Sequence, residues 1–157
     1  ISKHSAGTPN GWIIFTGVSG GCYGSPSRAA FYTSNICGDE LTGTTSVVDG
    51  QWHHLACVVA GGAVKRLYVD GVLEDTGPAT PIVATGSQLM LGGLTSGGSP
   101  IAAYTGLIDD VQVYDIALSC KQVESMFADP GSTAPNVFDL NFDGAVNGAD
   151  LGILLSG

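Results

Sequence analysis

Short apolar runs separated by turn residues set the pattern of this chain. Thr, Val, Tyr and Ile are frequent in these runs and strong helix formers are few, which favours strands over helices. The turn Asp49-Gly50 separates two of the runs and predicts a hairpin. We predict strands at residues 11–15, 29–33, 45–48, 51–60, 64–70, 72–74, 88–91 and 106–115.

The strictest alternation of apolar and polar residues occurs at 106–115. Leu107, Asp109, Val111 and Val113 fall on one face of this segment, which predicts a strand with one wetter side. A long loop rich in Gly and Ser precedes it at 92–103, and loops of this length are often functional.

One helix is predicted after this strand. Ser119 and Gln122 form a capping box, and Val123, Met126 and Phe127 follow at helical spacing. The residues that follow break the helix and have the composition of a linker. The sequence thus predicts a main domain at 1–128, a linker at 129–135 and a second unit at 136–157.

The composition supports an all-β fold with one main domain, since 24 of the 157 residues are glycine and only 12% are charged. The net charge of −9 repels phosphate backbones and anionic lipids, so we expect no nucleic-acid partner. The apolar runs are far shorter than the roughly 20 residues of a membrane-spanning helix, so we expect no membrane span. Without a signal peptide, the chain is expected to be a mature product or a fragment.

The four cysteines lack the C-x-x-C spacing of zinc and redox sites. Cys22 and Cys37 lie in turns on either side of 29–33, and a disulfide between them would staple a hairpin in an oxidising compartment. Two unpaired thiols are the alternative, because geometry decides the pairing. Cys57 and Cys120 are predicted to be small buried apolar residues.

Two segments strongly resemble bacterial laminin-G-like jelly-roll domains, which have the concanavalin A-like fold. The first runs from VDGQWHHL at 48–55 to LYVDG at 67–71, and the second is GLIDDVQVYD at 106–115 followed by ALS at 117–119. The resemblance covers residues 1–127 and implies an antiparallel jelly-roll β-sandwich of two curved sheets. It also implies that His53 and His54 are framework residues of a strand.

Members of that family usually begin with further strands upstream of the part matched by residues 1–3. A sandwich without those strands is expected to expose unpaired edges. Either the chain is a fragment, or another copy or a partner fills the gap by strand addition.

The fullest chemical pattern is DLNFDGAVNGAD at 139–150. Oxygen-bearing residues stand at the spacing of an EF-hand loop, and Gly144 takes the position that needs a sharp turn. An acidic turn without bound metal is the alternative. We predict a calcium site formed by Asp139, Asn141, Asp143, the backbone carbonyl of Ala145, Asn147 and Asp150.

This loop and the apolar residues after it resemble one dockerin repeat. Dockerin domains carry two such repeats, and this chain contains one. The resemblance therefore leaves docking to a cohesin partner open, and calcium that simply orders the tail is the other reading.

The sequence contains no recognisable catalytic arrangement, and we expect no enzyme activity. The glutamates Glu40, Glu74 and Glu124 are scattered, without the Glu-x-Asp-x-x-Glu pattern of the glucanases that share this fold. Asp109 and Asp110 are expected to point to opposite faces of a strand. The Gly-rich stretches lack the lysine of a phosphate-binding loop.

Two functions stay open. The first is an extracellular or cell-surface module that binds carbohydrate or a surface protein. Tyr23 and Tyr104 are candidates to stack on sugar rings, although an ordinary loop or core position explains each of them better. The second is a structural subunit of a self-assembling filament or surface layer, in which copies complete one another by strand addition. An accessory domain of an enzyme would require a longer parent chain.

Overall fold

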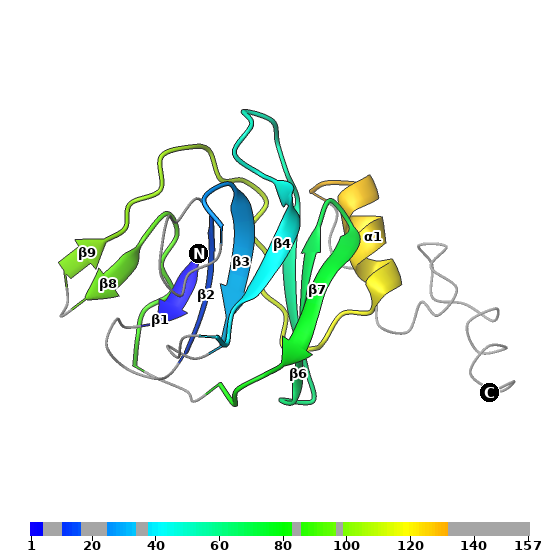
Figure 1. Ribbon diagram of the computed structural model, residues 1–157, viewed down its shortest axis with the longest axis horizontal. Coiled ribbons are helices and arrows are strands. Elements are labelled where there is room, and N and C mark those ends of the chain that lie inside the picture. The colour runs from blue at the N-terminus through cyan, green and yellow to red at the C-terminus, as the bar shows by residue number, and fades with distance from the viewer. Residues whose placement is uncertain (5–10, 17–24, 34–37, 83–85, 97–98, 132–157) are drawn as a thin grey trace, which may run out of the picture.

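The computed structural model describes residues 1–4, 11–16, 25–33, 38–82, 86–96 and 99–131. Within them the chain is all-β with one short helix, as the sequence predicts (Figure 1). The strands are β1 (Ser2–His4), β2 (Gly11–Thr16), β3 (Arg28–Tyr32), β4 (Leu41–Ser46), β5 (Leu55–Ala60), β6 (Val64–Val69), β7 (Val72–Pro78), β8 (Leu94–Ser96) and β9 (Ser99–Ile101). The helix is α1 (Cys120–Ala128).

Two antiparallel sheets form the two layers of a sandwich. The first has the strand order β1-β2-β3-β4 and the second the order β5-β6-β7, while β8 and β9 form a separate two-stranded hairpin. Neighbours in each sheet are also neighbours in sequence, which is the simplest antiparallel arrangement. Figure 1 shows β4 and β7 side by side where the two sheets approach each other, in agreement with their contacts.

The core lies between the two sheets, where alternate residues of each strand face inward. β3 contributes Ala29 and Phe31, and β6 contributes Leu67 and Val69, all of them at most 3% exposed. Burying a side chain of this kind stabilises the fold by about 1.5–3 kcal/mol. Further inward-facing residues pack around this cluster: Trp12, Ile14, Leu41, Val47, Leu55, Cys57 and Val59.

Helix α1 covers the outer face of the second sheet. Val58 of β5 and Tyr68 of β6 form a second buried cluster with Leu118 and Val123. The predicted capping box is present, because the Ser119 Oγ accepts a hydrogen bond from the backbone N–H of Gln122 while the Ser119 N–H donates to Gln122 Oε1. The helix therefore starts where the sequence predicts.

The predicted hairpin of 45–48 and 51–60 is wrong. β4 ends at Ser46 and belongs to the first sheet, whereas β5 begins at Leu55 and belongs to the second. The residues between them form an irregular connection that crosses from one layer to the other. His53 and His54 accordingly precede β5 and do not lie in a strand.

The predicted strand at 106–115 is also wrong, because this segment pairs with no described strand. Asp110 has a φ of 48°, in the left-handed region, and this breaks the regular alternation of an extended chain. The predicted strand at 88–91 is reduced to a single bridge between Ser2 and Met90. The predicted loop at 92–103 contains β8 and β9.

The predicted strands at 11–15, 29–33 and 64–70 match β2, β3 and β6 closely, while β7 extends further than the predicted 72–74. The unit at 136–157 and most of the linker lie outside the described residues. No helix in the described part of the chain is long and apolar enough to cross a membrane.

Candidate functional site

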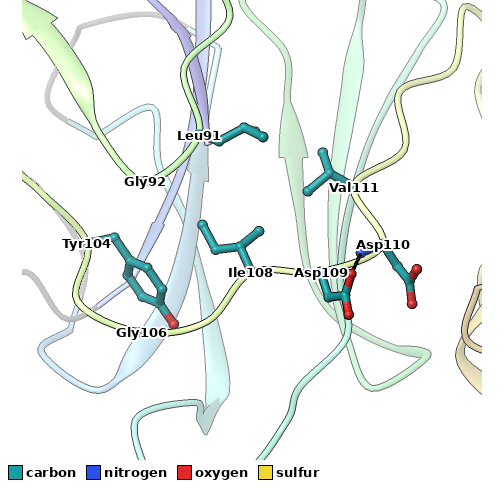
Figure 2. A pocket seen from close by; sticks show the side chains of 8 residues that line it. All are labelled: Leu91, Gly92, Tyr104, Gly106, Ile108, Asp109, Asp110 and Val111. Carbon is teal, nitrogen blue, oxygen red and sulfur yellow. Dashed lines mark hydrogen bonds between the residues drawn. The ribbon is translucent and has the colours of Figure 1, made fainter.

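A hollow of about 440 Å³ opens beside the segment that joins β9 to α1 (Figure 2). This volume suits a small ligand or one sugar unit of a larger one. The lining combines an aromatic ring, two carboxylates and aliphatic side chains: Leu91, Gly92, Tyr104, Gly106, Ile108, Asp109, Asp110 and Val111.

Tyr104 is held in place by its backbone and by two glycines. Its N–H donates a 2.8 Å hydrogen bond to the carbonyl oxygen of Gly92. A Cβ added to Gly106 would lie 2.6 Å from the Tyr104 hydroxyl and 2.7 Å from its ring, so only glycine allows the ring to lie against the backbone there. With the side chain 49% exposed, the ring offers a surface to a ligand. Tyr23, the other predicted stacking residue, lies outside the described residues.

Asp109 and Asp110 lie on the rim of the hollow. The Asp109 Oδ1 accepts a 2.9 Å hydrogen bond from the Asp110 N–H. Figure 2 shows both carboxylates on the same side of the segment, with Ile108 and Val111 on the other. The prediction that the two carboxylates point to opposite faces is therefore wrong, because it required a regular strand and Asp110 has a positive φ.

His53 holds the connection between β4 and β5 together. Its Nδ1 lies 2.8 Å from Asp70 Oδ2 and its Nε2 lies 3.1 Å from Asp49 Oδ1. The hydrogen bond with Asp70 raises the pKa of His53, and the bond with Asp49 adds to this although burial opposes it. Burial lowers the pKa of the neighbouring His54. Both histidines therefore have a structural role, but they lie in the connection before β5 and not in a strand.

The chain from residue 3 to residue 124 matches a family described as the concanavalin A-like lectin/glucanases superfamily. The chain belongs to this superfamily. It is also 32% identical over 96 residues to "Sushi, von Willebrand factor type A, EGF and pentraxin domain-containing protein 1" of Rattus norvegicus and 33% identical over 94 residues to that of Mus musculus. These alignments cover 56% and 55% of this chain and 3% of each relative, so the chain spans a small part of their length.

Among solved structures, the chain resembles a crystal structure of an S-layer domain-containing protein from Clostridium thermocellum. The TM-score is 0.46 and the sequence identity is 20%, and the match covers 64% of this chain and 51% of that one.

Four residues of this superfamily member form a largely buried polar cluster that the sequence pattern did not predict. The Lys65 ammonium lies 2.8 Å from Asp39 Oδ1, and the Asp39 carboxylate also accepts hydrogen bonds from the Thr33 N–H at 3.1 Å and the Thr80 hydroxyl at 3.0 Å. Burial would raise the pKa of Asp39, but these bonds outweigh it and lower the pKa. Lys65 and Leu67 are two residues apart, so their side chains share the inward face of β6. This spacing was the signal in the sequence that Lys65 would be buried.

The carboxylate of Glu74, one of the glutamates considered for catalysis, is hydrogen-bonded to the outer edge of β4. Its Oε2 accepts a 2.6 Å hydrogen bond from the Thr44 N–H, and its carboxylate also accepts from the N–H and the hydroxyl of Thr45. Asp75 accepts from the Thr42 N–H at 2.9 Å. Burial would raise the pKa of Glu74, yet these donors lower it.

The described cysteines are Cys57 and Cys120, and both are free. Burial raises the pKa of the Cys57 thiol, as expected for an inert core residue. Cys120 is exposed, so its prediction as a buried residue is wrong, and its Sγ lies 3.3 Å from the Tyr68 hydroxyl. The predicted pair Cys22 and Cys37 lies outside the described residues.

The described residues contain no group of three or more His, Cys, Asp or Glu side chains that could hold a metal ion. All the predicted calcium ligands lie outside the described residues: Asp139, Asn141, Asp143, Ala145, Asn147 and Asp150. Calcium binding therefore stays a prediction from the sequence.

Proposed function

We propose that this domain is a non-catalytic, extracellular or cell-surface module that binds a glycan at the hollow beside Tyr104. The observation that carries the proposal is that a half-exposed tyrosine and two aspartates are among the residues that line one hollow. An aromatic face packs well against the apolar face of a sugar ring. Carboxylate oxygens accept hydrogen bonds from sugar hydroxyl groups.

The charge of the site favours an uncharged sugar. Asp109 and Asp110 stand on the rim, and the whole chain carries a net charge of −9. An acidic glycan would be repelled both locally and at a distance. We therefore infer that the ligand is a neutral hexose or a glycan that ends in one.

The carboxylates do not suit glycoside hydrolysis. That reaction needs two carboxyl groups on opposite sides of the bond that breaks. Asp109 and Asp110 are consecutive residues, both exposed, and their carboxylates lie on one side of the segment. Glu74 is engaged by the backbone of β4. This arrangement supports binding without turnover.

A glycan array tests the proposal. The intact chain should bind a subset of neutral glycans, and Tyr104→Ala should lose about tenfold in affinity, which corresponds to about 1.4 kcal/mol. Binding to acidic glycans alone, or binding that Tyr104→Ala leaves unchanged, would rule out this site.

A structural subunit that assembles with other copies is a second candidate. The observation that favours it is that β5 is an outer strand of its sheet and carries no charged residue. Light scattering over a range of chain concentrations tests it, because assembly through this edge predicts a mass that rises with concentration.

The C-terminal loop is proposed to bind calcium. The support is the spacing of Asp139, Asn141, Asp143, Asn147 and Asp150 in the sequence. The bound ion would order the tail, since the carboxylates repel one another without it.

A further inference from the structure

The outer strands of the two sheets differ in how their free edges are protected. Ser2 of β1 and Met90 exchange two backbone hydrogen bonds, of 2.9 and 2.8 Å. The outward N–H groups of β4 donate to Glu74 and Asp75. β7 itself contains those two acidic residues and ends at Pro78. Charge, proline and covering segments are the usual means by which proteins prevent an edge strand from pairing.

β5 lacks charge and proline, and no segment of the described residues is hydrogen-bonded to its outer side. Its six residues, LACVVA, include neither a charged residue nor a proline. It stands at the end of its sheet, next to β6 alone. Among the backbone hydrogen bonds of the described residues, none joins the outer side of β5 to another segment.

The register shows which groups of β5 face outward. The Asp70 N–H donates a 2.9 Å hydrogen bond to the His54 carbonyl oxygen, directly before the β5–β6 pairing of Leu55 with Val69. Residues that bond to the partner strand alternate in an antiparallel pair. Ala56 and Val58 therefore bond to β6. The residues whose N–H and C=O groups point away from β6 are Leu55, Cys57 and Val59.

The surroundings of β5 define the chemistry of a strand that could pair with it. The inward side chains of β5 belong to the core between the sheets, and Val58 on its outer face belongs to the cluster beneath α1. A strand added next to β5 would continue both layers and would be apolar on both faces. Ala56 and Cys57 are small and leave room for larger neighbours.

A nearby segment adds apolar surface. Tyr114 packs against the cluster that contains Val58, which places the end of the β9–α1 connection next to β5. In that connection Val111 and Val113 are 37% and 64% exposed. A single strand beside β5 could cover part of this surface.

We propose that the outer edge of β5 is a docking site for one extended strand of a partner protein, and that this strand is uncharged and apolar on both faces. It would add to the sheet through the outward backbone groups of Leu55, Cys57 and Val59. The second candidate function places another copy of this chain at this same edge. We favour a partner protein, because each copy carries a net charge of −9 and Asp109, Asp110 and Asp115 lie in the neighbouring connection.

Hydrogen exchange of individual backbone amides tests this proposal on the intact chain. In the free protein the amides of Cys57 and Val59 should exchange fast, while that of Val58 should be protected by β6. The probe is a synthetic peptide of alternating isoleucine and valine, six residues long to match β5, with a lysine tail for solubility. Its addition should slow exchange at Cys57 and Val59 by about tenfold or more. A peptide with proline at its centre is the control and should have no effect.

Val59→Pro provides a second measurement. It removes an outward N–H without removing a hydrogen bond to β6, so peptide binding should fall while the Val58 amide stays protected. If this variant does not fold, the wild-type exchange data still decide. Tyr104→Ala should bind the peptide normally, which separates this site from the proposed glycan site.

Three results would overturn the proposal. The first is that Cys57 and Val59 are already protected in the dilute free chain. The second is that the alternating peptide has no more effect than the proline peptide. The third is protection that grows with the concentration of the chain alone, because that outcome identifies a second copy as the occupant.

Discussion

The ammonium of Lys65 lies 2.8 Å from the carboxylate of Asp39, and their side chains are only 1% and 12% exposed. A charge this well buried is stable only when it is paired and hydrogen-bonded. Thr33 and Thr80 donate the additional bonds that the carboxylate needs. The pair therefore ties β6 to the residues just after β3, just before β4 and just after β7.

Replacement of Asp39 should destabilise the domain strongly. Asp39→Asn leaves the Lys65 charge buried without its partner, and we expect a loss of about 3–5 kcal/mol of unfolding free energy. Urea unfolding measures it. The control is Asp115→Asn at an exposed position, which should change stability by about 0.5 kcal/mol or less. Equal losses in the two variants would show that the pair has no special role.

Glu74 is expected to stabilise the contact between the two sheets at their β4–β7 side. Glu74→Gln keeps the size of the side chain but removes the charge that accepts from Thr44 and Thr45. We expect a loss of about 1–3 kcal/mol. Glu124→Gln, at an exposed position of α1, is the matched control and should have little effect. A wild-type midpoint in urea for Glu74→Gln would contradict this account.

The stability of the domain should depend on pH through His53. Its pKa is raised in the folded state, so its contribution is complete below its ordinary value of about 6.5 and disappears as the pH rises through the folded value. The stability advantage of the wild type over His53→Gln should therefore be larger at about pH 5.5 than at about pH 9.

His54 provides the opposite sign as an internal control. Burial lowers its pKa, so its contribution is present above the ordinary value and is lost as the pH falls. His54→Gln should therefore reduce the acid-side loss of stability. The same pH dependence in both variants would mean that the two rings do not differ in environment as described.

Calcium should bind to the C-terminal loop with one ion per chain. Calorimetric titration of chelator-treated protein should show this, and Asp139→Ala or Asp143→Ala should abolish it because each removes an oxygen ligand. Asp115→Ala should bind normally. The absence of any heat at millimolar calcium would leave the loop as an acidic turn.

The sequence predicted those strands and the helix start whose signals lie in residues close together in the chain. The apolar runs of β2, β3 and β6 are bounded by turns, and Ser119 with Gln122 determines the start of α1. The segments 48–55 and 106–115 carried the likeness that indicated the superfamily. These features depend on residues that are close together in the sequence.

The failures concern pairing and position in space. Asp49-Gly50 looks like a hairpin turn, but the chain crosses there to the other sheet, and His53 bonds to Asp49 and Asp70 within this connection. The alternation at 106–115 requires a neighbouring strand, and Asp110 interrupts it with a positive φ. Tyr104 was predicted as a candidate, but its position against Gly106 at the hollow depends on the loop conformation, which no residue pattern encodes.

The most direct test of the proposed function is a calorimetric titration of a neutral glycan into the wild type, Tyr104→Ala and Trp52→Ala. Trp52 is 66% exposed and lies outside the hollow, so it is the competing aromatic surface. The account predicts that Tyr104→Ala weakens binding by about tenfold while Trp52→Ala binds like the wild type. Loss of binding in Trp52→Ala with full binding in Tyr104→Ala would contradict it.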